Sequence, residues 1–483
     1  MKNITYLTGL MMSLAVCLTS CEGDLEENPA GNISIANFYS SEDDAVAGLY
    51  GVYNAVYSLY GNTAINYGEV NADNATVSPN VSDLFEWDEF TYSNEVTEGF
   101  WRSAYDGINL ANEVALYTAE IDFDEEKRAD IVSEAKALRA LFYWHLVRTM
   151  GGVPIYETPT IGFDAVDTPR ATADEVYSLI TRDLGEAALE LPETSLAGRL
   201  NAHIADALLA RIYLYRNDFE NALVHAKRVI DSGAYDLFDD YAHIFKTEHN
   251  NGIEHIYQIQ YLSGERNNPI PGSFGPRALP GSYGNSFWAN TVVGGSIAPS
   301  TEFTDDNPIS YRRSVTIADS YEHIDGVTGT ITMEEAYGPG VYPYYVSKFD
   351  DRANELQSGV NFNVIRFADV LLIAAEALNE VDPEDNNKYT WINRVRERAR
   401  NGVETDLSDL AGLSQDEFRT AVLEERRFEL AFEGQRAWDL KRRGEFLNVM
   451  RDQGKNVEDY KLLFPIPNNQ VRLNPNLTQN EGW

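Results

Sequence analysis

The segment from Glu424 to Leu440, EERRFELAFEGQRAWDL, constrains the fold more than any other part of this sequence. At 3.6 residues per turn its apolar side chains fall on two sides of one helix, which predicts a helix packed between layers. A buried charge costs several kcal/mol unless it is paired and hydrogen-bonded. The segment therefore predicts a continuous helix that carries an internal arginine–carboxylate network. Its members are Arg426, Arg427, Glu429, Glu433 and Arg436.

The distribution of charge along the chain favours a structural role for this segment. Between Lys388 and Arg443 there are 12 basic and 11 acidic side chains, whereas the whole chain has a net charge of −38. Basic residues are thus concentrated where a neutral, paired core is needed, which favours fold-defining salt bridges over catalysis. The helix is expected to begin at Ser414, because Ser414 and Glu417 have the spacing of a capping box.

Several motifs resemble those of the SusD/RagB family, which comprises nutrient-binding outer-membrane lipoproteins of Bacteroidetes. The first is ERRFELAFEGQRAWDLKRRG, and four others follow the family's order: Glu134–Ile155, Asn363–Glu380, Ile392–Arg400 and the C-terminal LFPIPNNQVRLNPNLTQNEGW. Together they span nearly the whole mature chain. The resemblance implies a mainly α fold, in which tetratricopeptide-like helical pairs form a single-domain superhelix over residues 37–483. This superhelix would support an irregular, loop-rich region with a few short strands.

The first 20 residues have the pattern of a lipoprotein signal peptide. Lys2 precedes an apolar run from Ile4 to Leu18 that is too short to span a bilayer, and the sequence LTSC follows. This ending resembles a lipobox, in which Cys21 becomes the acylated N-terminus. The alternative is an ordinary secretory signal that happens to contain Cys21. The lipid anchor would attach the mature chain to the cell outer membrane.

Residues 21–36 form an acidic tether after the signal peptide. Such a run is usually only a solvated linker. The family resemblance implies instead that acidic residues after the cysteine direct the lipoprotein to the outer leaflet. The protein is therefore expected to face the cell exterior.

Apolar residues at helical spacing predict a largely helical chain. The predicted helices are residues 37–60, 100–120, 131–149, 172–191, 202–215, 219–232, 365–380 and 389–400. The run LLARIYLYRNDFENALVHAKRVI resembles one tetratricopeptide repeat, whereas the last two helices match that repeat poorly. Short strands are expected in residues 255–261 and 327–333.

Two stretches, residues 61–98 and 263–352, lack a long helical period and are rich in Gly, Pro, Asn, Asp and Tyr. Long loops within a compact domain are uncommon unless they are functional or disordered. We therefore expect the binding regions of the protein in these two stretches.

The sequence contains none of the common catalytic or metal-binding motifs. HExxH, a Walker A loop, G-x-S-x-G and CxxC are all absent, so we predict no catalytic residues, no metal and no cofactor. Carboxylate pairs suited to glycoside hydrolysis are expected by chance among 76 acidic residues. The strongly acidic balance also argues against nucleic acid as a partner.

Binding-site candidates come from the tryptophans, because a sugar stacks its C–H face on an aromatic ring while polar side chains contact its hydroxyls. Of the 7 tryptophans, only Trp87 and Trp288 lie in the loop-rich stretches. The resemblance agrees, since family members bind glycans with aromatic residues on loops in these parts of the chain. For each aromatic ring the alternative is a buried loop anchor, and Asp73 has the alternative of a structural role. The candidate ligand-binding residues are Trp288, Tyr283, Asn285, Trp87, Asn66, Tyr67, Asp73 and Asn74.

The sequence and the resemblance together predict a cell-surface lipoprotein that binds an oligosaccharide. It would deliver this ligand to a SusC-like TonB-dependent outer-membrane transporter, on which it would act as a lid. Two alternatives remain at this point: a RagB-like protein for peptide uptake and, from another class, a surface glycosidase.

Overall fold

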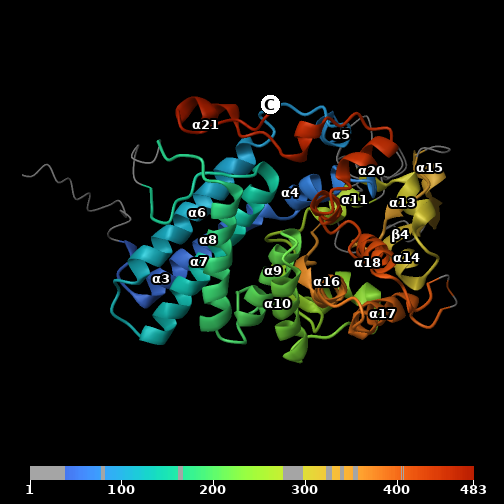
Figure 1. Cartoon of the computed structure of the whole chain (residues 1–483), viewed down its shortest axis with the longest axis horizontal. Helices are drawn as coiled ribbons and strands as arrows, with labels where there is room; N and C mark the ends of the chain where they lie inside the picture. The colour runs from blue at the N-terminus through green and yellow to red at the C-terminus, as the bar shows by residue number, and fades with distance from the viewer. Residues whose placement is uncertain are drawn as a thin grey trace, which may run out of the picture. The chain divides into compact units, whose positions relative to one another are not determined.

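The computed structural model describes residues 38–77, 82–160, 167–275, 297–322, 329–337, 342–351, 357–403, 405 and 407–483. Residues 41–483 form one compact unit. This unit is mostly helical, with a few short strands (Figure 1), so the predicted mainly α fold class is confirmed. In the described part of the chain, no helix is both long and apolar enough to cross a membrane.

Successive helices pack against one another and form the scaffold (Figure 1). They are α3 (Glu42–Val56), α6 (Glu98–Thr118), α7 (Glu125–Met150), α8 (Ala173–Glu190), α9 (Ala202–Tyr215), α10 (Phe219–Asp231), α16 (Phe367–Val381), α17 (Asn387–Arg400) and α18 (Gln415–Glu429). Several helices begin after an N-cap side chain that accepts a hydrogen bond from a backbone N–H group. Asn201 caps α9 in this way, and Asp218 caps α10. The helices predicted from periodicity are present, and α9 and α10 are the pair predicted to resemble a tetratricopeptide repeat.

The predicted continuous helix over residues 424–440 is wrong. Helix α18 does begin with a capping box between Ser414 and Glu417, but it ends at Glu429, and α19 (Arg436–Arg442) follows only after a turn. Within this turn Phe432 has a φ of 64° and Gly434 a φ of 78°, both in the left-handed region. A helix cannot continue through such residues, so the chain changes direction here.

The predicted network of buried arginine–carboxylate pairs is confirmed. At its centre Arg366 pairs with Glu254 (2.9 Å), Glu429 (2.6 Å) and Glu433 (2.9 Å), and its side chain is only 1% exposed. Arg398 joins two of these carboxylates. Burial alone would raise the pKa of Glu429, but the surrounding arginines outweigh this effect and hold the pKa below its ordinary value.

A second group of buried ion pairs connects α9, α16, α18 and α19. Asp369 on α16 accepts hydrogen bonds from Arg211 and from Arg426, the latter at 2.6 Å. Arg426 also pairs with Asp439 at 2.9 Å. Although burial would raise the pKa of Asp369, the two arginines lower it to about 2. Both groups are therefore dry clusters in which each arginine faces carboxylates.

The first loop-rich stretch packs against the turn between α18 and α19 through η2 (Asn66–Val70), a π-helical segment. The carboxylate of Glu69 is fully buried and accepts hydrogen bonds from the backbone N–H groups of Gly434 (3.0 Å) and Gln435 (3.2 Å). A Cβ atom on Gly68 would lie only 2.1 Å from the carbonyl oxygen of Gly434. Glycine is thus required for this close backbone contact.

The loop-rich stretches contain short elements rather than one extended sheet. The first stretch holds α4 (Asn62–Ile65), η2, β1 (Ala75–Val77) and α5 (Ser82–Asp88). The second holds α11 (Ile270–Phe274), β3 (Ile297–Pro299), α13 (Thr301–Asp306), α14 (Tyr311–Thr316), β4 (Ile317–Ala318), β5 (Ser320–Glu322), β6 (Thr330–Thr332), α15 (Met333–Tyr337) and β7 (Tyr345–Val346). In the described residues, strands pair as β1–β3, β4–β7, β5–β6 and β2 (His255–Ile259) with β8 (Phe362–Arg366), all antiparallel.

Candidate functional site

The two loop-rich stretches meet at the β1–β3 pair, where Thr76 lies opposite Ala298. Two further hydrogen bonds extend the pairing, since Ser300 donates its backbone N–H to the carbonyl of Asn74 (2.9 Å) and its hydroxyl to the carbonyl of Asp73 (2.5 Å). We call this region, formed by residues 72–77 and 297–302, the loop junction. It brings together the two parts of the chain in which the sequence predicts binding.

The C-terminal part of the chain forms one side of the loop junction. Lys455, which follows α20 (Phe446–Asp452), donates to Asp88 at 2.7 Å and to Glu89 at 2.6 Å. Asp88 in turn accepts a hydrogen bond from the backbone N–H of Val77 at 3.1 Å. This chain of contacts holds α5 and β1 against the end of α20.

A cavity of about 200 Å³ opens at the loop junction. It is lined by Ala72, Asp73, Ala75, Thr76, Ser300, Thr301, Glu302, Met450, Gln453 and Lys455. With its amide nitrogen turned toward Glu302, Gln453 donates to both carboxylate oxygens, at 3.0 and 3.2 Å. Hydroxyl, carboxylate, amide and ammonium groups thus surround a small space, and together they can donate and accept hydrogen bonds to ligand hydroxyls.

Asp73, which lines this cavity, and its neighbour Asn74 are both held by arginines. Asp73 is buried and receives two hydrogen bonds from Arg436, at 2.7 and 2.8 Å. Burial would raise the pKa of Asp73, but the bonds to Arg436 outweigh it and lower the pKa. Asn74 accepts a hydrogen bond from Arg427 at 3.0 Å. These contacts favour the structural role that the sequence left open for Asp73.

Trp87 and Tyr67 lie in an aromatic cluster next to the loop junction. Their ring centroids are 4.6 Å apart, and both rings pack against Phe464. Trp87 is only 9% exposed, so most of its ring faces other side chains rather than solvent. Asn66 begins η2, and its carbonyl accepts a hydrogen bond from Asn71. This geometry favours loop anchors for the two rings, and a ligand contact by any of these residues stays a prediction.

Four predicted functional residues lie outside the described residues: Trp288, Tyr283, Asn285 and the proposed lipid-anchor residue Cys21. Their roles stay predictions. The cavity also contains residues that the sequence did not single out. Thr301 and Glu302 lie within the second loop-rich stretch, whose composition was the available signal. Gln453 and Lys455 carry no local signal, because only the fold brings them to the loop junction.

Among the described residues, no group of three or more His, Cys, Asp and Glu side chains converges in a way that would hold a metal ion.

Sequence comparisons cover most of the chain. The profile of the SusD family matches residues 320–483, and a profile described as "Starch-binding associating with outer membrane" matches residues 25–214. SusD-like protein P2 of Formosa agariphila is 31% identical over 512 residues, an alignment that covers 99% of this chain and 98% of the relative. The chain belongs to the SusD family. The resemblance inferred from the motifs is thereby confirmed.

Solved structures of the SusD family have the same fold. A SusD superfamily protein from Parabacteroides distasonis is 26% identical and superposes with a TM-score of 0.77, covering 92% of this chain and all of the other. A laminarin-binding SusD-like protein gives a TM-score of 0.77 at 24% identity, with 92% of this chain and 100% of the other covered. At that identity the second match supports the fold alone.

Proposed function

We propose that this protein is a surface lipoprotein that captures a glycan at the loop junction without cleaving it. The observation that carries the proposal is the β1–β3 pairing, which brings the two loop-rich stretches together beside a cavity of hydrogen-bonding groups. The match of residues 25–214 to the profile described as "Starch-binding associating with outer membrane" supports it. In this proposal Trp288 supplies the stacking surface, with Tyr283 and Asn285 beside it.

The proposal places the chain on the cell exterior and gives it a transporter as its partner. Residues 1–20 would be the signal peptide, Cys21 the lipid anchor, residues 21–36 the tether and residues 37–483 a single folded domain. The captured oligosaccharide would pass to a SusC-like TonB-dependent transporter. The profile that matches residues 25–214 is described as associating with the outer membrane, which supports this location.

Calorimetry on the full chain tests the binding proposal, with laminarin, other neutral polysaccharides and unrelated peptides as probes. We expect a neutral glycan to bind, and Trp288→Ala to weaken its binding by about 2 kcal/mol or more, the scale of a binding hot spot. Phe287→Ala is the companion variant, because neighbouring side chains of an extended segment face opposite sides. It should lower fold stability and leave the affinity unchanged.

Three results would contradict this proposal. Unchanged affinity in Trp288→Ala would remove that residue from the site. Binding of peptides instead of glycans would favour the RagB-like alternative. Shortened products after incubation with a glycan would indicate a glycosidase.

The anchor is tested separately, by fractionation of cells that lack the transporter. Cys21→Ala should release the protein from the outer membrane, because the lipid is the proposed hydrophobic attachment. Protease treatment of whole cells tests the orientation, and complete protection would contradict an exterior location.

A further inference from the structure

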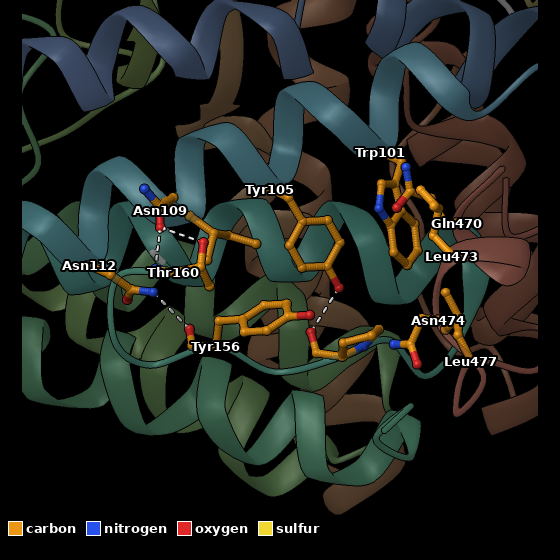
Figure 2. Close-up of a pocket in the computed structure, with 12 residues that line it drawn as sticks. Trp101, Tyr105, Asn109, Asn112, Tyr156, Thr160, Gln470, Leu473, Asn474 and Leu477 are labelled. Atoms are coloured by element: carbon orange, nitrogen blue, oxygen red, sulfur yellow. Dashed lines mark hydrogen bonds between the residues drawn. The ribbon is translucent and has the colours of Figure 1, made fainter. Parts of the chain in front are cut away.

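A second cavity lies between α6, residues 154–160 and the C-terminal helix α21 (Asn468–Leu473), as Figure 2 shows. Its volume is about 260 Å³. The lining residues are Trp101, Tyr105, Ile108, Asn109, Asn112, Pro154, Tyr156, Thr160, Gln470, Leu473, Asn474 and Leu477. None of these described residues is charged, although 24% of the chain is. The cavity therefore suits an uncharged ligand, since an ion inside it would lose hydration without gaining an opposite charge.

Three aromatic rings form much of the wall. Trp101 and Tyr105 lie one turn apart on α6, with ring centroids 4.7 Å apart. Tyr156 approaches from the opposite side, 5.7 Å from Tyr105 and almost perpendicular to it. Figure 2 shows the rings of Trp101 and Tyr105 pointing from α6 toward this opposite wall. Aromatic walls of this kind can pack against the C–H face of a sugar.

Hydrogen bonds hold the walls in place. Asn112 donates to the carbonyls of Tyr156 (3.0 Å) and Thr158 (3.1 Å), which fixes the segment opposite α6. Asn109 accepts the backbone N–H of Thr160 at 2.7 Å, and the hydroxyl of Tyr105 donates to the carbonyl of Pro154 at 2.8 Å. Most polar groups of these walls thereby have a hydrogen-bond partner within the protein. The cavity is preformed, so little ordering is needed when a ligand enters.

Hydrogen-bonding capacity remains at the end of the cavity formed by α21. The side-chain amide of Gln470 and the indole N–H of Trp101 have no hydrogen-bond partner among the described residues. Leu473, on the same helix as Gln470, is 65% exposed. Asn474 holds the end of α21 by donating to the carbonyl of Thr168 at 2.7 Å. This end thus combines free polar groups with an exposed apolar side chain.

We propose that this cavity is a second carbohydrate site, which takes one uncharged sugar unit. Its volume is just below the range of about 300–1,000 Å³ that is typical of small-molecule pockets, which fits a single sugar ring better than an oligosaccharide. The ring would lie against Tyr105 and Trp101, with its hydroxyls toward Gln470. The inference extends the proposed glycan binding to a site separate from the loop junction. Two sites on one chain would strengthen the capture of a polymer that spans both of them.

Fluorine NMR on the full chain labelled with fluorotryptophan tests this proposal directly. The Trp101 signal is assigned with Trp101→Phe, and glucose, methyl glucosides and short glucans serve as probes. We expect the Trp101 signal to shift saturably with at least one of them. Gln470→Ala should weaken that response at least threefold, because it removes the free amide.

Leu473→Arg is the blocking variant, since it places a long charged side chain at the exposed end of the cavity. It should abolish the Trp101 response and leave the melting temperature unchanged, because Leu473 is mostly exposed. Leu189→Arg is the matched control: Leu189 is 80% exposed on α8 and does not line the cavity. It should respond like the wild type.

The outcomes separate this inference from the proposed function. If calorimetry detects a bound glycan while the Trp101 signal stays fixed, or shifts equally in Leu473→Arg, the second site is wrong and the proposed function stands. If no probe binds by either method, both are wrong. If the Trp101 response persists in Trp288→Ala while calorimetric affinity falls, the two sites are distinct and the inference is supported.

Discussion

The buried ion-pair network and the loop junction use the same residue types in opposite ways. Around Arg366 both partners of every pair are dehydrated, and the three carboxylates come from two separate segments of the chain. At the edge of the loop junction one pair has an exposed partner: Arg427 pairs with buried Asp73 but also with Asp306, whose side chain is 58% exposed. The network therefore resists rearrangement, whereas a ligand can compete for the outer charges of the loop junction.

This difference shows how the protein separates stability from recognition. Removing one partner from a dry cluster leaves uncompensated charge, while an exposed pair loses little because water replaces the partner. Substitutions in the network should therefore change the free energy of unfolding. Substitutions at the surface of the loop junction should change affinity and leave stability nearly constant.

The largest effect is expected for Arg366→Ala. It would remove one arginine partner from each of Glu254, Glu429 and Glu433 and leave excess negative charge in a dry environment, so we expect a loss of about 3–5 kcal/mol in the free energy of unfolding. Arg394→Ala is the matched control, because Arg394 and its partner Asp236 are 39% and 60% exposed. It should cost roughly 0–1 kcal/mol. Urea denaturation of both variants measures these changes. Equal losses in the free energy of unfolding would contradict the distinction between buried and exposed pairs.

The next largest effect is expected where the first loop-rich stretch touches the scaffold. Gly68→Ala should destabilise the protein by about 3 kcal/mol, because no rotamer can relieve a clash with the backbone carbonyl of Gly434. Gly51→Ala in α3 is the control, since a Cβ there meets no atom within 4 Å. This control should stabilise the protein by about 0.5–1 kcal/mol through higher helix propensity. If Gly68→Ala left the free energy of unfolding unchanged, η2 could move away from the turn without destabilising the protein.

Glu69 predicts a pH dependence at the same contact. Burial raises its pKa to about 7, although backbone N–H donors and Lys348 act in the opposite direction. The folded state therefore binds the proton more tightly than the unfolded state does. The resulting stabilisation is complete below the unfolded pKa of about 4.5 and is lost as the pH rises through about 7. Ionisation of Glu69 should thus remove roughly 2–3 kcal/mol between about pH 5 and about pH 8.

The test is Glu69→Gln, compared with the wild type by denaturation at both pH values. The variant should gain stability relative to the wild type as the pH rises, because its side chain does not ionise. Parallel pH profiles would mean that Glu69 does not titrate in this range.

The smallest expected effect concerns recognition at the loop junction. Gln453→Ala removes one amide from the cavity, so a glycan bound there should lose about one hydrogen bond, or roughly 0.5–1.5 kcal/mol. Calorimetry should show a few-fold weaker affinity, and thermal denaturation an unchanged midpoint. A drop in the melting temperature with constant affinity would place Gln453 in the scaffold instead.

Local patterns in the sequence predicted the scaffold well. The helix of residues 202–215 and the capping box at Ser414 follow from apolar spacing and from cap chemistry, which act within a few residues. The same periodicity failed between Glu429 and Arg436. The left-handed backbone at Phe432 and Gly434 lies where Gly434 packs closely against Ala64 and Gly68, which are distant in the sequence, so helical spacing does not reveal it.

The binding sites were predicted less completely, because distant segments build them. Trp101 was not among the candidates, because it lies in a predicted helix; it is 6% exposed, yet it lines the cavity in Figure 2. Lys455 reaches the loop junction only because Asp88 lies beside it in the fold. Sequence composition located the loop-rich stretches but could not reveal which side chains face a cavity.

The first loop-rich stretch is attached to the C-terminal part of the chain, and this affects the order in which regions fold during synthesis. Glu69 bonds to Gly434, Asp73 to Arg436 and Asp88 to Lys455, and each contact joins residues more than 360 positions apart. Synthesis at about 5–20 residues per second would make the later partner roughly 20 to 70 seconds after the earlier one. Until then the first loop-rich stretch lacks these anchors. The loop junction must therefore be among the last regions to form, and a chain released early would have part of its helical scaffold but no completed loop junction.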